Sequence, residues 1–313
     1  MLRNFTAAYL FAILYAFMAT PAQAIQRASV ASYGNDANIC SSSSPCRTFA
    51  KAVTVVDPNG EVVALDSAGY GTVTLTQSIS LTAAPGAVAG ITVFPGTNGV
   101  TIATPGVNVV LRGLTINSQG GDTGILMTAG DKLSIENCVI SNFSISGSAF
   151  NQIAIFVEAA ATVRVVKTLI RDNDIGAQFL KGATADISGS TFFGNTSAGI
   201  IAQNSTAGST TTVAINKTVV AGSSIGIYSL ADTNTASAKV DITHSIVSNS
   251  GIGVASESAA GAASVSMRKN MVTGSSTHGL SQLFSGTLTS YGKNALSNNA
   301  INVAGTLTTA APL

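Results

Sequence analysis

The sequence has 313 residues, of which only 9% are charged, and its 15 basic and 14 acidic residues give a formal net charge of +1. Ordinary globular domains carry about 25% charged residues, so the surface of this protein must consist largely of Ser, Thr, Asn, Gly and Ala. Nothing in this balance resembles the basic footprint of a nucleic-acid-binding protein. We therefore expect no nucleic-acid partner.

The N-terminus has the features of an export signal. Arg3 precedes an apolar run over residues 5–18, and the small-residue site Ala22, Gln23, Ala24 follows it. This arrangement predicts a secretory signal peptide over residues 1–24. A retained N-terminal anchor is the alternative, but the run is shorter than a typical membrane span. We expect an exported protein, extracellular or periplasmic, with no membrane span after cleavage.

Residues 25–60 form the predicted lead-in and N-terminal cap. Cys40 and Cys46 flank a serine-rich segment, and in an oxidising compartment this pair predicts a small disulfide loop. Two unrelated buried thiols are the alternative. A metal site is disfavoured because two cysteines with no nearby histidine supply too few ligands.

A short amphipathic helix is predicted directly after these cysteines. Ser44 followed by Pro45 is a good helix start. Four apolar residues then fall on one helical face, namely Phe49, Ala52, Val53 and Val56. We expect this helix to cover the open N-terminal end of the elements that follow, because an exposed apolar interior and strand edge need a cap.

Residues 61–116 contain short β-rich segments. Pro-Gly pairs beginning at Pro85, Pro95 and Pro105 separate several of them as turns. The expected strands cover residues 61–65, 72–76, 79–81, 91–94, 100–102 and 109–116.

From residue 133 onward one pattern recurs seven times. A rung reads apolar, any, apolar, any, turn residue, small polar residue, apolar pair, any, and then Asn, Asp or Gly, often followed by Gly-Ile. Its second apolar residue falls at Ile135, Val165, Ile187, Ile215, Ile242, Met267 and Tyr291, at spacings of 22 to 30 residues. A fixed inner pattern with a drifting period predicts regular strands joined by one connecting loop of variable length.

Three further columns appear when the rungs are aligned. An apolar column reads Ile140, Ile170, Phe192, Val220, Val247, Val272 and Leu296. A small polar column reads Cys138, Thr168, Ser190, Thr218, Ser245, Asn270 and Asn294. The corner column reads Asn142, Asp172, Gly194, Gly222, Asn249, Gly274 and Asn298. Strand alternation points the first two inward, where stacked hydroxyls and amides can hydrogen-bond, with Cys138 a buried packing thiol. The third suits left-handed corners.

Strands this short, returning so regularly with no amphipathic helix between them, do not fit βαβ units. We predict an all-β right-handed parallel β-helix, a solenoid over residues 61–313 with a short N-terminal capping helix and rungs about 4.8 Å apart. A β-sandwich is the alternative. The predicted register places Arg164 and Asp186 side by side on successive rungs.

Several motifs together carry a family resemblance. They are PCRTFA at residues 45–50, DSAGYGTVTLTQSIS at 66–80, LRGLTIN at 111–117 and IENC at 135–138. The chain resembles the exported bacterial right-handed parallel β-helix repeat proteins of the pectin-lyase-like superfamily, over nearly all of its mature length. The resemblance implies the fold and an exported location. It implies no activity, because many members of that family have none assigned.

A catalytic site of the kinds found on this fold does not align. Pectate lyases need carboxylates on neighbouring rungs, whereas the corner column holds only one acid, Asp172, and the position two residues later only Asp174. The Gly-His-Gly motif of polygalacturonases is absent, and only His278 before a glycine approaches it. The best catalytic candidates are Arg171, Asp172 and Asp174, which could perform acid–base chemistry. A polar corner loop with a local salt bridge is the alternative.

One outer column is rich in cations. The turn position of the seven rungs reads Asn137, Lys167, Gly189, Lys217, His244, Lys269 and Lys293. We call its five basic residues (Lys167, Lys217, His244, Lys269, Lys293) the lysine column. They could match the carboxylates of an acidic polysaccharide, or they could be solvated turn residues that deter sheet stacking.

The expected function is that of an exported, non-catalytic β-helix that binds an acidic polysaccharide or displays a surface to another cell-surface glycan or component. Neither a cofactor nor a metal is expected. The alternative is a polysaccharide lyase, hydrolase or epimerase of the pectin-lyase-like type that acts on an acidic polysaccharide.

Overall fold

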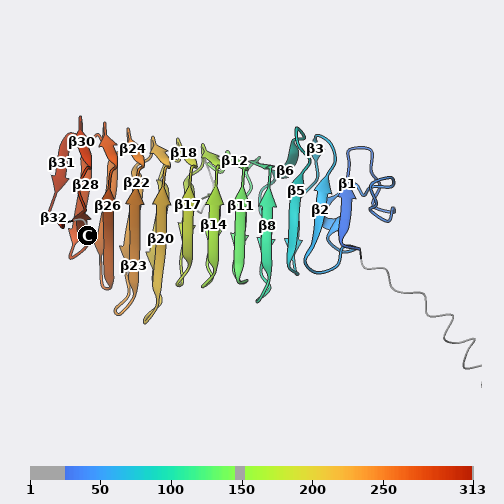
Figure 1. The fold of residues 1–313 in the computed structure, drawn as a ribbon, viewed down its shortest axis with the longest axis horizontal. Helices are drawn as coiled ribbons and strands as arrows, with labels where there is room; N and C mark the ends of the chain where they lie inside the picture. The colour runs from blue at the N-terminus through green and yellow to red at the C-terminus, as the bar shows by residue number, and fades with distance from the viewer. Residues whose placement is uncertain (1–24, 145–151, 312–313) are drawn as a thin grey trace, which may run out of the picture.

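The computed structural model describes residues 25–144 and 152–311. The signal peptide predicted over residues 1–24 lies outside the described residues. Within them the chain coils into three parallel sheets of 12, 10 and 10 strands, stacked along the long axis from the blue N-terminal end to the red C-terminal end (Figure 1). The predicted all-β parallel solenoid is confirmed.

From β2 onward successive strands pass to different sheets, so each sheet contains every third strand, and β1 adds one more strand to sheet A beside β2. Sheet A contains β1 (Arg27–Val30), β2 (Gly60–Ala64), β5 (Ile79–Ala83), β8 (Asn108–Arg112), β11 (Lys132–Glu136), β14 (Thr162–Val166), β17 (Thr184–Ser188), β20 (Thr210–Asn216), β23 (Ser237–Thr243), β26 (Ala262–Arg268), β29 (Thr287–Ser290) and β32 (Leu307–Thr309). Sheet B contains β3 (Ala68–Gly69), β6 (Ala89–Val93), β9 (Leu114–Ser118), β12 (Val139–Ser141), β15 (Leu169–Arg171), β18 (Thr191–Phe193), β21 (Val219–Ala221), β24 (Ile246–Ser248), β27 (Met271–Thr273) and β30 (Ala295–Ser297). Sheet C contains β4 (Val73–Leu75), β7 (Asn98–Ile102), β10 (Thr123–Met127), β13 (Ile153–Val157), β16 (Ile175–Phe179), β19 (Ala198–Asn204), β22 (Ile225–Ala231), β25 (Ile252–Ser258), β28 (His278–Phe284) and β31 (Ile301–Ala304).

The apolar columns line the interior as predicted, with two exceptions near the C-terminal end. Ile215 and Val220 are each at most 1% exposed, and the same positions of the preceding rungs are buried too. Tyr291 is 38% exposed, which contradicts its predicted inward place. Met267 pairs with Ser290, the residue before Tyr291. The inward position of this rung therefore lies one residue earlier than the repeat pattern predicts. Leu296 is only partly buried against the core.

The small polar column forms a hydrogen-bonded ladder inside the coil. The Thr168 N–H donates to Ser190 Oγ at 3.2 Å, and the Ser245 N–H donates to Asn270 Oδ1 at 2.9 Å. The Asn270 N–H continues the ladder to Asn294 Oδ1 at 3.0 Å. These bonds satisfy backbone groups that the tight turn leaves unpaired, which is necessary in a dry interior.

Left-handed backbone torsions turn the chain from sheet A to sheet B and from sheet B to sheet C. All seven residues of the predicted corner column have positive φ, from 52° at Asn249 to 74° at Gly222. The lysine column is also left-handed, with φ of 49° at Lys217. A strand predicted over residues 109–116 is divided into β8 and β9, because Gly113 has φ of 72° and makes the same turn.

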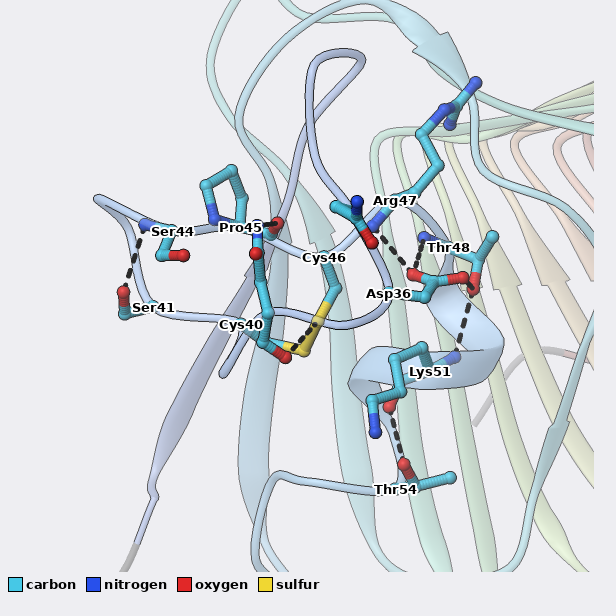
Figure 2. Close-up of a disulfide and its surroundings, with 12 residues drawn as sticks. Asp36, Cys40, Ser41, Ser44, Pro45, Cys46, Arg47, Thr48, Lys51 and Thr54 are labelled. Atoms are coloured by element: carbon cyan, nitrogen blue, oxygen red, sulfur yellow. Dashed lines mark hydrogen bonds between the residues drawn. A yellow bond between two sulfur atoms is a disulfide. The ribbon is translucent and has the colours of Figure 1, made fainter.

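The N-terminal lead-in is held by a disulfide and an aspartate. Cys40 and Cys46 are bonded, with Cα atoms 4.6 Å apart, as predicted (Figure 2). The carboxylate of Asp36 accepts hydrogen bonds from the N–H groups of Arg47 and Thr48 at 2.8 and 3.0 Å. These bonds fix the chain between the disulfide loop and the helix.

The predicted helix is present but begins later than expected. Helix α2 covers Phe49–Ala52, and its N-cap is Thr48, whose Oγ1 accepts from the Lys51 N–H at 3.1 Å. Ser44 is not the helix start, because its N–H donates to Ser41 and closes a turn within the disulfide loop (Figure 2). Phe49 and Ala52 are fully buried, which confirms the first half of the predicted apolar face, whereas Val53 and Val56 lie beyond the end of the helix.

Charged side chains on the outer face of sheet A lie where the predicted strand register places them. Arg164 and Asp186 are direct partners on β14 and β17, as predicted. The Arg164 guanidinium also lies 4.0 Å from the Glu136 carboxylate, which Arg112 approaches to 3.0 Å from the other side. Exposed pairs of this kind contribute at most about 1 kcal/mol each, so this ladder fixes register more than it stabilises the fold.

The remaining cysteine, Cys138, is free and 1% exposed. Burial raises the pKa of its thiol to about 11, so the reactive thiolate is a minor species near neutral pH. We expect no thiol to react with an aromatic disulfide reagent in the native protein, and one per chain in denaturant without reductant. Two reactive thiols in the native protein would contradict both the disulfide and the burial of Cys138.

Candidate functional site

The lysine column lies at the corner where sheet A turns into sheet B. Lys217, His244, Lys269 and Lys293 occupy four consecutive rungs, because the N–H of each of the first three bonds at 3.2 Å to the carbonyl immediately preceding the next. All four are exposed. With rungs about 4.8 Å apart, they form a straight row of basic side chains. Lys167 lies two rungs before Lys217, with Gly189 between them.

The position itself does not favour lysine. A left-handed torsion costs least for glycine and asparagine, and those residues occupy the same position at Gly189 and Asn137. Lysine gains nothing from this backbone conformation, so its presence on four rungs, with histidine on a fifth, is better explained by its charge.

The three catalytic candidates lie together at the opposite corner, between sheets B and C, but each acid already has a partner. Arg171 and Asp172 form an ion pair. Asp174 accepts a hydrogen bond from the Thr196 hydroxyl at 2.7 Å and one from the Gln152 N–H at 3.4 Å. The ion pair and the hydrogen bonds are those expected of a polar corner loop held by local contacts. A catalytic role for these residues stays a prediction.

A group of side chains that the repeat pattern did not predict lies on the outer face of sheet C. Tyr228 donates its hydroxyl to Glu257 on the next strand, and burial together with this hydrogen bond raises the pKa of the phenol. Beside it, Gln203 accepts from Gln178 at 2.8 Å and donates to Asp232 at 2.8 Å. This cluster, which we call the sheet C cluster, places an aromatic ring, one carboxylate and two amides on adjacent strands and a second carboxylate, Asp232, directly after β22.

A sequence signal for this cluster exists. Strands β16 and β22 of sheet C each have a glycine at their second position, Gly176 and Gly226, and the residue two places after it points outward, as Gln178 and Tyr228 do. The repeat pattern was written as ending at this point of each rung, so it did not predict the strand of sheet C or its outer face.

Hollows in the surface are shallow and lined mainly by uncharged residues. One, of about 570 Å³, lies between helix α2 and sheet C and is lined by threonines such as Thr72, Thr74 and Thr101. A second, of about 310 Å³, lies on sheet A beside the lysine column and includes Asp241, Arg268 and Tyr291. Among residues 25–144 and 152–311 no group of three His, Cys, Asp or Glu side chains is placed to hold a metal ion.

No helix in the described part of the chain is long and apolar enough to cross a membrane. His278, which begins β28, is partly buried and lies on sheet C, away from the lysine column. It belongs neither to the lysine column nor to the corner of Arg171, Asp172 and Asp174.

Comparison with known proteins agrees with this architecture. Residues 88–219 match a family model described as a right handed beta helix region. No curated protein matches the sequence at a significant level.

Solved structures share the fold at low sequence identity. Pectate lyase Pel9A is 16% identical, with a TM-score of 0.61 over 92% of this chain and 78% of its own. The alginate lyase from Paenibacillus sp. str. FPU-7 is 12% identical, with a TM-score of 0.57 over 90% and 99%. Tailspike protein 2 of Escherichia coli O157:H7 bacteriophage CAB120 is 14% identical, with a TM-score of 0.55 over 83% of this chain and 38% of its own.

At these identities the likeness concerns the fold and not the activity. The family match and the three coiled parallel sheets together show that this chain folds as a right-handed parallel β-helix.

Proposed function

We propose that this protein is exported and binds an acidic polysaccharide along the lysine column, without chemical turnover. The observation that carries the proposal is the run of basic residues on four consecutive rungs, Lys217, His244, Lys269 and Lys293. A polysaccharide is a repeating ligand, and a row of equally spaced cations is a repeating site. Export is supported by the Cys40–Cys46 disulfide, since such bonds persist in oxidising compartments.

Electrostatics favours a ligand at this corner. Two like charges at the rung spacing repel by about 1 kcal/mol in water, and a bound polyanion would relieve that repulsion. Two of the structural neighbours are named for the acidic polysaccharides pectate and alginate, which supports a ligand of this class.

The proposal predicts a position-specific effect of lysine removal. Lys269→Ala should weaken binding of polygalacturonate by about two- to fivefold at low salt, because one exposed charge contact contributes up to about 1 kcal/mol. Lys239→Ala is the matched control: Lys239 is exposed on β23, at the far end of the strand from His244. Isothermal titration of both variants at low and high salt measures the difference. Equal affinities for the two variants would contradict the proposal.

A second candidate, a polysaccharide lyase, hydrolase or epimerase, is favoured by the sheet C cluster. Tyr228 and Glu257 on neighbouring strands and Asp232 directly after β22 supply a phenol and two carboxylates, which are groups that acid–base catalysis uses. If this site is catalytic, Glu257→Gln should lower turnover of polygalacturonate or alginate by about a hundredfold or more.

The control for that variant is Glu158→Gln, because Glu158 follows β13 on the outer side of the same sheet and pairs with Lys181 at 3.8 Å. New unsaturated or reducing ends measure cleavage, and proton NMR detects epimerisation. A parent protein that changes neither polymer contradicts the second candidate.

A further inference from the structure

Beside the lysine column runs a second, apolar column that strand alternation places on the outside of sheet B. Val219, Ile246 and Met271 are register partners on successive strands and are 36%, 42% and 44% exposed. Each follows a basic residue by two positions. Exposed side chains of this size in a continuous row are unusual in a soluble protein and mark interaction surfaces.

A third column completes the face. Ser248, Thr273 and Ser297 are register partners two residues further along the strands, and Ser297 Oγ lies 3.3 Å from Thr273 Oγ1. These small residues keep the floor beside the apolar column flat and offer hydroxyl groups on successive rungs.

Three consecutive rungs therefore present a repeated set of three groups. The sets are His244, Ile246 and Ser248, then Lys269, Met271 and Thr273, then Lys293, Ala295 and Ser297. Each set offers a basic group, an apolar group and a hydroxyl in the same order from the corner inward along sheet B.

The inner ladder keeps these columns in step. Between the basic and apolar residues lie Thr218, Ser245 and Asn270, all at most 4% exposed. The Thr218 N–H donates to Ser245 Oγ at 3.1 Å, and the Ser245 N–H donates to Asn270 Oδ1 at 2.9 Å. A hydrogen-bonded inward residue between the basic and apolar groups of successive rungs, ending at Asn294, which accepts from the Asn270 N–H at 3.0 Å, fixes the backbone on both sides, so the face is preorganised and loses little entropy on binding.

We propose that this face binds a uronic-acid polysaccharide lying parallel to the axis of the β-helix, with about one sugar per rung. This inference rests on the proposed function and specifies its ligand. A uronate sugar has a carboxylate, an apolar ring face and hydroxyls, which match the basic, apolar and hydroxyl columns. The rung spacing of about 4.8 Å is close to the length of one pyranose in an extended chain.

The test separates sugar contacts from charge alone. The variant combines Ile246→Ser with Met271→Ser, and the probes are polygalacturonate and polyglutamate, an acidic polymer without sugar rings. The variant should bind polygalacturonate about tenfold more weakly, because it loses apolar area that the sugar would cover. Its affinity for polyglutamate should stay unchanged.

The matched control combines Val139→Ser with Leu169→Ser, which alter the same column on β12 and β15, outside the run of four basic residues. It should lose less than twofold in affinity. Thermal midpoints of both double variants verify folding. Unchanged polygalacturonate binding by the Ile246/Met271 variant, or an equal loss for both polymers, overturns the inference. If Lys269→Ala still weakens binding in that case, the proposed function stands, whereas a parent that binds neither polymer defeats both.

Discussion

Ile215→Asp is expected to unfold this protein or to bring it close to unfolding. Ile215 is 1% exposed and stacks between Ile187 and Ile242 on neighbouring rungs of sheet A. An aspartate there would bury a charge without a partner, which costs several kcal/mol. Whole native domains are stable by only about 5–15 kcal/mol, so one such change removes a large part of the total.

Lys217→Ala is the control for this variant, because Lys217 lies two residues away on the exposed corner. It should change the free energy of unfolding by no more than about 0.5 kcal/mol. Urea titration followed by circular dichroism compares the two. If Lys217→Ala unfolds as readily as Ile215→Asp, the inward and outward columns are assigned wrongly.

Phe192→Ala is expected to destabilise the protein by about 3–5 kcal/mol, because it leaves a cavity in a closely packed interior. Phe192 on β18 is fully buried. The next residue supplies a control of the same type, since Phe193 is 56% exposed on the outer face. Phe193→Ala should change stability by about 0.5 kcal/mol or less.

The same urea titration measures both phenylalanine variants. Similar losses for Phe192→Ala and Phe193→Ala would mean that β18 does not alternate between core and solvent. A small loss for both would mean that the interior repacks around the cavity.

The inner columns could be predicted from the sequence because their physics repeats. An apolar residue at Ile170 or Val220 and a small polar residue at Thr168 or Thr218 meet the same neighbours on every rung. The left-handed corners could also be predicted from the sequence, because few residue types tolerate those torsions.

Sheet C was harder to predict because its strands begin in an atypical way. Gly226 is the second residue of β22. A Cβ added to it would lie 2.5 Å from the carbonyl oxygen of Gly253 on the next rung. That close approach requires glycine and breaks the polar–apolar alternation by which strands are recognised. The error at Tyr291 has a different origin, because β29 is one of the last strands and its turn departs from the repeat.

The candidate site was only partly predictable for a related reason. Lysines at the turn position were evident as a column, but a row of surface cations has the same sequence pattern whether or not it binds a ligand. The apolar column of Val219, Ile246 and Met271 is the outward member of each apolar pair by strand alternation, but only the structure shows that these side chains are exposed and lie in one row.

Carbodiimide coupling of polygalacturonate to the native protein tests the central claim most directly. This reagent joins a carboxylate to a lysine amine only when the two are in contact, and peptide mapping then identifies the lysines modified. We expect Lys217, Lys269 and Lys293 to carry most of the coupled sugar. Coupling spread evenly over all lysines, or concentrated on Lys51, Lys132 and Lys239, would contradict it.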